Sequence, residues 1–305
     1  MANKTKVSII GCGRVGITAA YTMYLKDHVY EIVLFDRDKK RIEAERLDFL
    51  HGLPFMGKSK IKVATELRDI AGSDVIIYTV GASQKPGETR LQLVKKNTEI
   101  LETVFPKLLK YSRESVFLIV ANPVDVLTYK AYKLAKLPRG RIFSTGTTLD
   151  TARYRYYLSE KLKVNPRSIH GYVLGEHGDS SFATITETNV GGQPILTIGD
   201  INKSDAADAY RKSRDAAYEV IAGKGATYYS IGVVISEIVE AIIDDSRRIY
   251  PVSVPLKGEY GIEGVSLSVP CVIGRGGVKR IMEIKLSPEE KILLKLSAST
   301  IRQYL

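Results

Sequence analysis

One glycine-rich motif restricts this chain to a small set of folds. Residues 7–10 are mostly β-branched and lead directly into Gly11-Cys12-Gly13-Arg14-Val15-Gly16, a G-x-G-x-x-G sequence that precedes a segment with helical periodicity. Gly11 permits a tight turn, Gly13 lets the main chain approach a diphosphate, and Gly16 allows the helix to pack closely on the strand. The free N–H groups at the helix start then face the phosphates. The motif predicts a dinucleotide site.

The predicted cofactor is NAD. Asp36 stands twenty residues after Gly16, at the end of the second predicted strand. At this position a carboxylate accepts hydrogen bonds from the adenosine ribose hydroxyls, and its charge repels the 2′-phosphate of NADP. Arg37, the next residue, is the one cation that could weaken this discrimination. Gly11, Gly13, Val15, Gly16 and Asp36 are therefore the expected cofactor-binding residues.

The first half of the chain alternates strand-like and helix-like segments, which predicts an α/β fold. Strands are expected at 6–10, 31–35, 61–64, 75–80, 116–120 and 141–144, and helices at 15–26, 39–51, 91–110 and 124–136. This order fits a Rossmann-type doubly wound parallel sheet over residues 1–145, the NAD-binding domain. Longer helices at 148–162, 203–222 and 226–244 predict a C-terminal α+β catalytic domain over residues 146–305, with ligands in the cleft between the two.

Charge and composition argue against several other classes of protein. The 45 Lys and Arg residues outnumber the 34 Asp and Glu residues, but they are scattered among the acids. We therefore expect no nucleic-acid partner, although a nucleic-acid-binding protein is the alternative from another class. Cys12 and Cys271 lie far apart, and we expect no metal. No apolar run approaches the ~20 residues that cross a bilayer, and the polar N-terminus favours a cytoplasmic protein.

Four further segments carry a family resemblance. They are residues 81–90 (GASQKPGETR), 121–125 (ANPVD), 146–153 (GTTLDTAR) and 175–180 (GEHGDS). Together they resemble the bacterial L-lactate dehydrogenase branch of the lactate/malate dehydrogenase family, and the similarity runs almost end to end. The resemblance implies NAD-dependent interconversion of pyruvate and L-lactate in glycolysis and fermentation, in a homotetramer.

The chemistry of this reaction suits three of the residues. Reduction of a 2-keto acid needs a proton at the carbonyl oxygen, and His177 is the candidate donor near neutral pH. Asp150 would bind the other ring nitrogen and stabilise the imidazolium. Arg153, three residues further along the same predicted helix, would bind the substrate carboxylate through a planar two-bond pair.

The resemblance assigns roles to five more residues. Arg90 would arrive with a closing loop at 81–90 and polarise the substrate carbonyl, and closure would exclude water. Asn122 would hold a hydrogen bond near the nicotinamide and the substrate oxygen, and Thr227 would lie beside both. Gly81 and Ala82 would border the cofactor.

Gln84 is expected to select the substrate. Malate dehydrogenases of the family have an arginine at the matching position, which pairs with the second carboxylate of oxaloacetate. The neutral Gln84 should disfavour oxaloacetate by roughly 10²- to 10⁴-fold, because an unpaired carboxylate would be enclosed. Malate dehydrogenase and a broad L-2-hydroxyacid dehydrogenase are the alternatives within the enzyme class.

Two residues match a regulatory site of the family. Arg155 and His170 stand where bacterial L-lactate dehydrogenases bind fructose 1,6-bisphosphate between two subunits. Arginine and protonated histidine are suitable phosphate partners, and a two-fold axis suits a symmetric bisphosphate. The resemblance therefore implies allosteric activation through these residues.

Overall fold

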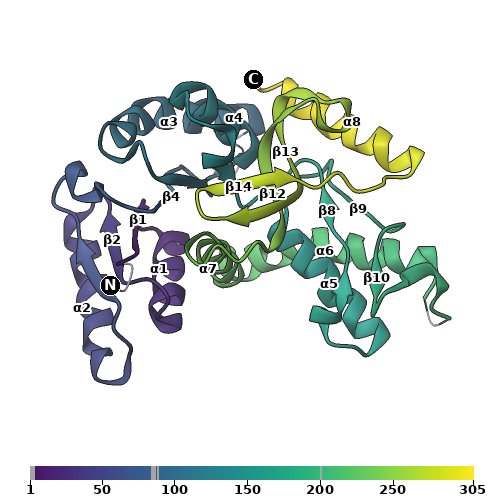
Figure 1. Ribbon diagram of the computed structural model, residues 1–305, viewed down its shortest axis with the longest axis horizontal. Helices are drawn as coiled ribbons and strands as arrows, with labels where there is room; N and C mark the ends of the chain where they lie inside the picture. Colours follow the sequence, from purple (N-terminus) through teal and green to yellow (C-terminus); the bar gives the residue numbers. More distant parts are fainter. Residues whose placement is uncertain (1–3, 84–86, 88, 200) are drawn as a thin grey trace.

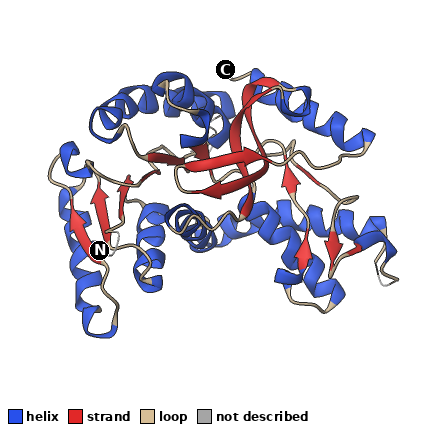
Figure 2. Cartoon of the chain, viewed as in Figure 1, coloured by secondary structure: helices blue, strands red, loops and turns tan. Residues whose placement is uncertain are grey.

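A mixed β-sheet runs through the centre of the protein (Figure 2). The computed structural model describes residues 4–83, 87, 89–199 and 201–305. The nine strands of the sheet have the order β14-β13-β12-β6-β5-β4-β1-β2-β3. Six adjacent strands of the sheet run parallel to one another: β1 (Lys6–Ile10), β2 (Glu31–Phe35), β3 (Lys60–Val63), β4 (Val75–Tyr78), β5 (Val116–Ile119) and β6 (Ile142–Ser144). All residues of β4 and β5 are buried, as parallel strands covered on both faces require.

The remaining three strands extend this sheet from the second half of the chain. They are β12 (Ile249–Lys257), β13 (Glu263–Gly274) and β14 (Gly277–Ile281), which pair antiparallel with one another. Ser253 of β12 pairs antiparallel with Ser144 of β6. One sheet therefore contains strands from both sides of residues 145 and 146. The domain boundary that the sequence predicts at these residues stays a prediction.

Helices cover both faces of the sheet (Figure 1). On one face lie α3 (Arg90–Ser112) and α4 (Val124–Ala135), and α4 packs on β12 and β13. On the other face α1 (Arg14–Lys26) packs against α7 (Tyr229–Ile243), with α2 (Lys39–His51) further along. Helix α8 (Pro288–Arg302) packs against β13. The helix expected from residue 226 begins at Tyr229, because Gly225 adopts a φ of +80° and ends the preceding helix.

The rest of the second half forms a small α+β unit. It contains α5 (Thr148–Leu162) and α6 (Lys203–Lys224), and two short antiparallel sheets. One sheet consists of β11 (Gln193–Pro194), β10 (Asn189–Val190) and β7 (Ile169–His170), and the other of β8 (Val173–Leu174) and β9 (Phe182–Ala183). The loop between β8 and β9 carries residues 175–181, so it holds one of the segments that resemble the family.

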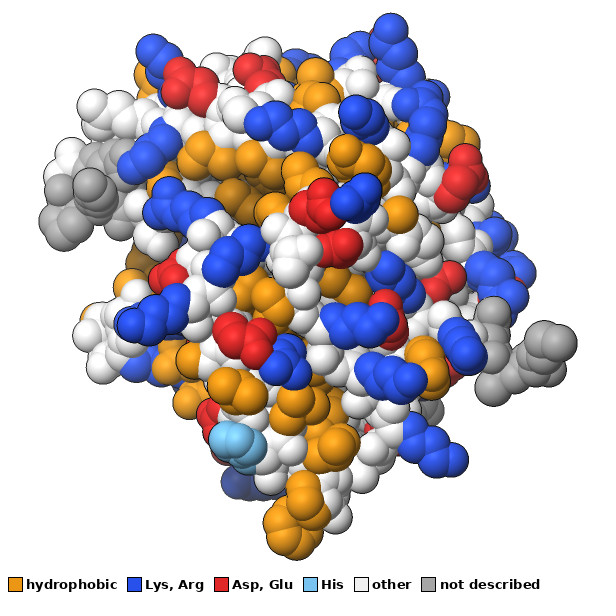
Figure 3. Space-filling view, turned by 90° about the vertical axis from the view of Figure 1, so that its left-hand side faces the viewer, with side chains coloured by type: hydrophobic (Ala, Val, Ile, Leu, Met, Phe, Trp, Pro, Cys, Tyr) orange, Lys and Arg blue, Asp and Glu red, His pale blue; other side chains and the backbone are white. Residues whose placement is uncertain are grey.

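Charged side chains are mixed on the face that carries α2 and β3. Lys and Arg side chains lie among Asp and Glu side chains there, and apolar side chains are exposed between them (Figure 3). Phe55, just after α2, is 91% exposed. In the described part of the chain, no helix is both long and apolar enough to span a membrane.

Candidate active site

A cavity of about 280 Å³ lies where α5, α6, the turn after β5 and the β8–β9 loop meet. It brings together six of the residues singled out in the sequence: Val15, Asn122, Asp150, Arg153, His177 and Thr227. These residues come from five separate stretches of the chain and face one space, as a binding site for a small molecule requires.

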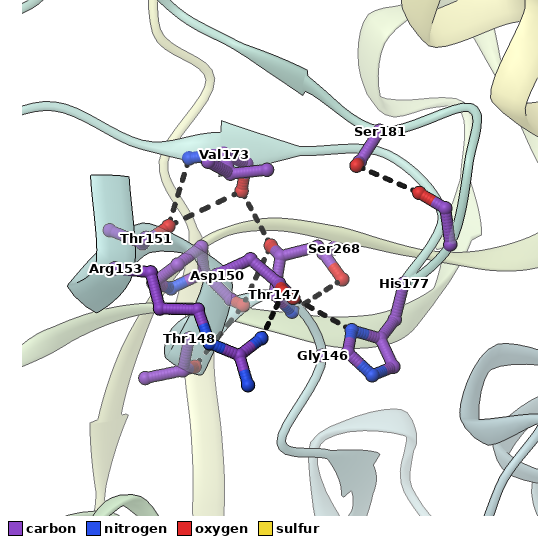
Figure 4. A network of polar contacts seen from close by, with 12 residues as sticks. Gly146, Thr147, Thr148, Asp150, Thr151, Arg153, Val173, His177, Ser181 and Ser268 are labelled. Atoms are coloured by element: carbon purple, nitrogen blue, oxygen red, sulfur yellow. Dashed lines mark hydrogen bonds and ion pairs between the residues drawn. The ribbon is translucent and has the colours of Figure 1, made fainter. Parts of the chain in front are cut away.

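His177, Asp150 and Arg153 form one hydrogen-bonded unit (Figure 4). Nδ1 of His177 lies 2.7 Å from Oδ2 of Asp150, and Nη1 of Arg153 donates to Oδ1 of the same carboxylate at 3.1 Å. The side chain of His177 is 29% exposed, whereas those of Asp150 and Arg153 are each 16% exposed. Because Nδ1 is engaged with Asp150, Nε2 is the ring nitrogen available to a bound ligand.

The charges of this unit shift two pKa values in opposite directions. Burial opposes protonation of His177, but the charge and hydrogen bond of Asp150, together with the charge of Asp125, outweigh it, so the pKa of His177 lies above its ordinary value of 6.5. Burial also opposes ionisation of Asp150, but the charges of His177 and Arg153 and the His177 hydrogen bond lower its pKa below the ordinary range. The pair therefore favours an imidazolium beside a carboxylate.

Local geometry places Asp150 beside the His177 loop. Gly146 has a φ of +48°, and a Cβ there would lie 2.5 Å from the main-chain nitrogen of Ser253, so glycine allows β6 and β12 to come close. Thr151 of α5 accepts a hydrogen bond from the Val173 N–H at 2.8 Å (Figure 4). This bond joins the first turn of α5 to β8, the strand that leads into the His177 loop.

The protein itself requires glycine at two positions of the G-x-G-x-x-G motif. Gly11 has a φ of +92°, and a Cβ on it would lie 2.9 Å from Val80. A Cβ on Gly16 would lie 2.2 Å from the carbonyl oxygen of Gly11. Gly13 differs, because its φ is −69° and a Cβ would meet no described protein atom within 4 Å. The open space in front of Gly13 therefore fits a bound group such as the NAD diphosphate.

The start of α1 is also suited to an anion. Gly13 is its N-cap residue and provides no side-chain cap, and the first turn contains no acidic residue. The N–H groups of this turn and the positive end of the helix dipole therefore face the space that Gly13 leaves open. The residues of the motif fit NAD.

Asp36 joins the end of β2 to the glycine loop. Its Oδ2 accepts the Cys12 N–H at 2.7 Å and a bond from Nη2 of Arg41 at 3.2 Å. Arg41 also donates through Nη1 to the Cys12 carbonyl oxygen at 2.6 Å. The cation that pairs with Asp36 is therefore Arg41 of α2, whereas the sequence drew attention to Arg37.

Replacing Asp36 by serine should narrow the preference for NADH over NADPH. The variant loses the carboxylate that repels the 2′-phosphate and frees Arg41 to bind it. One charge-assisted hydrogen bond corresponds to ~1.5–3 kcal/mol, so the ratio of the two kcat/KM values should fall by roughly 10- to 150-fold. Asp48→Asn, which removes an exposed charge further along α2, is the control. Equal use of both cofactors by the natural protein would contradict the assignment.

Asn122 is held by a buried residue that the sequence analysis did not identify. Nδ2 of Asn97 on α3 donates to the Asn122 carbonyl oxygen at 2.6 Å. The same side chain accepts the Ala82 N–H at 2.7 Å and donates to the Ala82 carbonyl oxygen at 3.1 Å. Asn97 thus holds the Gly81–Ala82 segment beside Asn122. A signal was present, because Asn97 shares the buried face of α3 with Leu93, Val94 and Leu101.

Arg90 lies next to the cavity without lining it. Its guanidinium forms an ion pair with Glu176, a fully buried carboxylate of the His177 loop, and lies 5.6 Å from the centre of the Tyr304 ring. The polarising role of Arg90 stays a prediction. Gln84, the expected specificity residue, lies outside the described residues.

Arg155 and His170 lie away from this cavity but close to each other. Nε of Arg155 donates to the carbonyl oxygen of Gly171, the residue after His170, at 3.1 Å. The Arg155 guanidinium lies 5.5 Å from the centre of the Tyr172 ring, and His170 on β7 is exposed. Their expected phosphate-binding role stays a prediction.

Comparisons with known proteins cover the whole chain. The family model for the "lactate/malate dehydrogenase, NAD binding domain" matches residues 5–144, and that for the "lactate/malate dehydrogenase, alpha/beta C-terminal domain" matches residues 147–305. An L-lactate dehydrogenase of Synechococcus sp. is 46% identical, over 98% of this chain and 97% of the relative. L-lactate dehydrogenase 1 of Clostridium acetobutylicum is 42% identical, over 100% of this chain and 99% of the relative.

Solved structures give the same result. A lactate dehydrogenase from a Medee basin deep-sea metagenome library superposes with a TM-score of 0.95 at 40% identity, covering 99% of this chain and 98% of that one. The minor L-lactate dehydrogenase from Enterococcus mundtii, in a ligand-bound form, has a TM-score of 0.94 at 38% identity, covering 99% of this chain and 97% of that one.

Proposed function

Because this chain belongs to the lactate/malate dehydrogenase family, we propose that the cavity beside His177 is where it reduces a 2-keto acid. The activity is that of an NAD-dependent L-lactate dehydrogenase, since relatives of that name are 40–46% identical over nearly the whole chain. The same relatives do not favour the malate dehydrogenase alternative. When bound along the glycine loop and Asp36, NADH supplies the hydride for this reduction.

The single observation that supports the site most is that one carboxylate, Asp150, holds both His177 and Arg153. In a 2-keto acid the carboxylate and the carbonyl are on adjacent carbon atoms, so the groups that bind them must also be adjacent. Arg153 binds the substrate carboxylate, and His177 then faces the carbonyl oxygen and donates its proton through Nε2. In lactate oxidation the neutral ring accepts that proton.

Asn122 and Thr227 complete the cavity in this proposal. Both line it, and the bond from Asn97 fixes the main chain of Asn122. Their hydrogen-bonding groups orient the substrate between the nicotinamide and His177. Arg90 leaves Glu176 when the 81–90 segment covers the substrate, and its charge then polarises the carbonyl.

The pH dependence of the reaction tests the assignment of His177. Reduction needs the imidazolium, so kcat/KM for pyruvate should be constant at low pH and fall as the pH rises through the raised pKa of His177. Asp150→Asn removes the charge that raises this pKa, so the fall should move to lower pH. Steady-state rates from about pH 5 to 9 measure both curves. A fall that moves upward in the variant, or no fall in the natural protein, would refute the assignment.

Gln84 sets the substrate preference in this proposal. A neutral side chain offers no partner for the second carboxylate of oxaloacetate, so pyruvate is the preferred substrate. The range of larger 2-keto acids depends on the width of the closed cavity. A cytoplasmic location and a role in fermentation stay predictions.

We also propose a homotetramer that fructose 1,6-bisphosphate activates. Arg155 on α5 bonds to the carbonyl oxygen of Gly171, the residue that follows His170 of β7. Two copies of this pair, related by a two-fold axis, would bring four basic groups together. A bisphosphate would neutralise their mutual repulsion and stabilise the interface.

Fructose 1,6-bisphosphate should lower the KM for pyruvate and shift the protein towards the tetramer. A coupling free energy of ~1–3 kcal/mol predicts a change of roughly 5- to 150-fold in apparent affinity. Pyruvate saturation curves and sedimentation measure it, with Arg155→Gln expected to be unresponsive and Arg211→Gln on the exposed side of α6 as the control. If the natural protein does not respond at any pH tested, this regulatory proposal is wrong.

A further inference from the structure

A buried carboxylate from α4 lies beneath the His177 loop. Asp125, in the first turn of α4, is 2% exposed. Its Oδ2 accepts the main-chain N–H of His177 at 2.8 Å. None of the roles assigned so far to the cofactor or the substrate uses this side chain. It nevertheless joins α4 directly to the main chain of the proposed proton donor.

Burying a charged carboxylate at this position costs desolvation free energy, and accepting one N–H bond does not require a charge. Burial raises the pKa of Asp125, which shows how strongly the surroundings oppose its charge, while Ser253, the His177 N–H and the charges of His177 and Arg90 lower it. A neutral amide would accept the same bond without the cost of burying a charge. What the carboxylate adds is a negative charge directed at His177, at the helix end where a negative charge is most stable.

The loop around His177 is fixed at several neighbouring points. Gly175 pairs with Ser268 through two main-chain bonds of 3.0 and 2.9 Å. Glu176 forms an ion pair with Arg90 and also binds Ser180. Asp125 accepts the main-chain N–H of His177 itself, so this bond fixes the main chain from which the imidazole extends. Asp150 binds Nδ1 and therefore fixes the orientation of the ring.

We propose that Asp125 is a positioning residue for the proton donor: it holds the main chain of His177 on α4, and its carboxylate adds a second negative charge, besides Asp150, that stabilises the imidazolium. This inference depends on the proposed role of His177. The charged or titratable groups that surround the imidazole are Asp150 and Arg153 on α5, Asp125 on α4, Tyr210, Arg214 and Tyr218 on α6, the Arg90–Glu176 pair, and Asp179.

Two substitutions separate the main-chain contact from the charge. Asp125→Asn keeps an oxygen for the His177 N–H but removes the charge, so kcat at low pH should stay close to that of the natural protein while the fall in kcat/KM for pyruvate moves to lower pH. Asp125→Ala loses both, and kcat should decrease by roughly 5- to 150-fold, the range expected when one buried hydrogen bond is lost. NADH binding, measured by fluorescence, should be unchanged in both.

The matched control is Thr128→Val, one turn further along α4. Thr128 is fully buried and donates to the Val124 carbonyl oxygen at 2.7 Å. This variant should lower the melting temperature without changing kcat or the pH profile. If both Asp125 variants behave in the same way as Thr128→Val, Asp125 serves stability alone and the inference is wrong. An equal loss of kcat in Asp125→Asn and Asp125→Ala would also overturn it, because the amide oxygen can accept the same bond.

A His177→Asn variant distinguishes a failure of the proposed function of His177 from a failure of the proposed role of Asp125. If it keeps normal turnover, the proposed function of His177 fails whatever the Asp125 variants do. If it is nearly inactive while both Asp125 variants keep the natural kcat and pH profile, only the role of Asp125 is refuted.

Discussion

Replacing His177 by asparagine should lower kcat for pyruvate reduction by at least ~10²- to 10⁴-fold, the usual contribution of a general acid. Asparagine is polar and similar in size, but it cannot give up a proton near neutral pH. The bond from Asp150 to the ring is lost as well, and Asp150 is then left with Arg153 as its partner. The glycine loop and Asp36 are unchanged, so NADH should still bind with nearly normal affinity.

Rapid mixing of the variant with NADH and pyruvate measures this prediction directly, because single-turnover rates separate chemistry from product release. His51→Asn is the control, since His51 is an exposed residue at the end of α2. A His177→Asn protein that keeps near-normal turnover would remove His177 from the mechanism.

Replacing Arg153 by lysine should decrease kcat/KM for pyruvate mainly through a higher KM. Lysine keeps the positive charge, but a compact ammonium cannot form the planar pair of bonds that a guanidinium makes with a carboxylate. Arg153 is 16% exposed, so the substrate carboxylate is partly removed from water when it binds there. The charge remains and one charge-assisted hydrogen bond is lost, which corresponds to ~1.5–3 kcal/mol and predicts a decrease of roughly 10- to 150-fold.

Pyruvate saturation curves at fixed NADH test this prediction. Arg211→Lys on the exposed face of α6 is the control, because its side chain is 60% exposed and pairs with Asp208. If Arg153→Lys keeps the natural KM, the substrate carboxylate binds elsewhere, and Arg214, the other arginine that lines the cavity, becomes the candidate.

The parallel half of the fold could be predicted closely from the sequence. The expected bounds of β1, β2, α2 and α5 agree with the structure. Each of these segments is short, strongly patterned and bounded by residues that end it locally. The Asp38 side chain shows how such a local contact works, because it accepts the Arg41 N–H and caps the start of α2.

The antiparallel extension of the sheet could not be predicted in the same way. β12 pairs with β6 more than a hundred residues earlier in the chain, and such a pairing depends on tertiary packing rather than on a local pattern. Helix α8 was not predicted either, although Ser287, Pro288 and Glu290 provide a capping box and a proline at its start. The start of this helix therefore has a clear local signal in the sequence.

The residues of the site also divide into those that the sequence identifies and those that only tertiary contacts reveal. His177, Asp150 and Arg153 were identified because their chemistry is explicit in the side chains, and the structure places them in one hydrogen-bonded unit. Residues that act through main-chain contacts, such as Asn97, could not be assigned a role, since the partner of a buried amide is not visible in a sequence. For the same reason the ion pair of Arg90 with Glu176 was not anticipated.

The most direct test is the rate of NADH oxidation by the natural protein with pyruvate and with oxaloacetate under the same conditions. In the proposed site, Arg153 and His177 would bind and protonate either 2-keto acid in the same way, so the difference between the two substrates reports the second carboxylate. We predict that kcat/KM for pyruvate exceeds that for oxaloacetate by roughly 10²- to 10⁴-fold. A higher kcat/KM for oxaloacetate would contradict the assignment of the reaction to pyruvate and L-lactate.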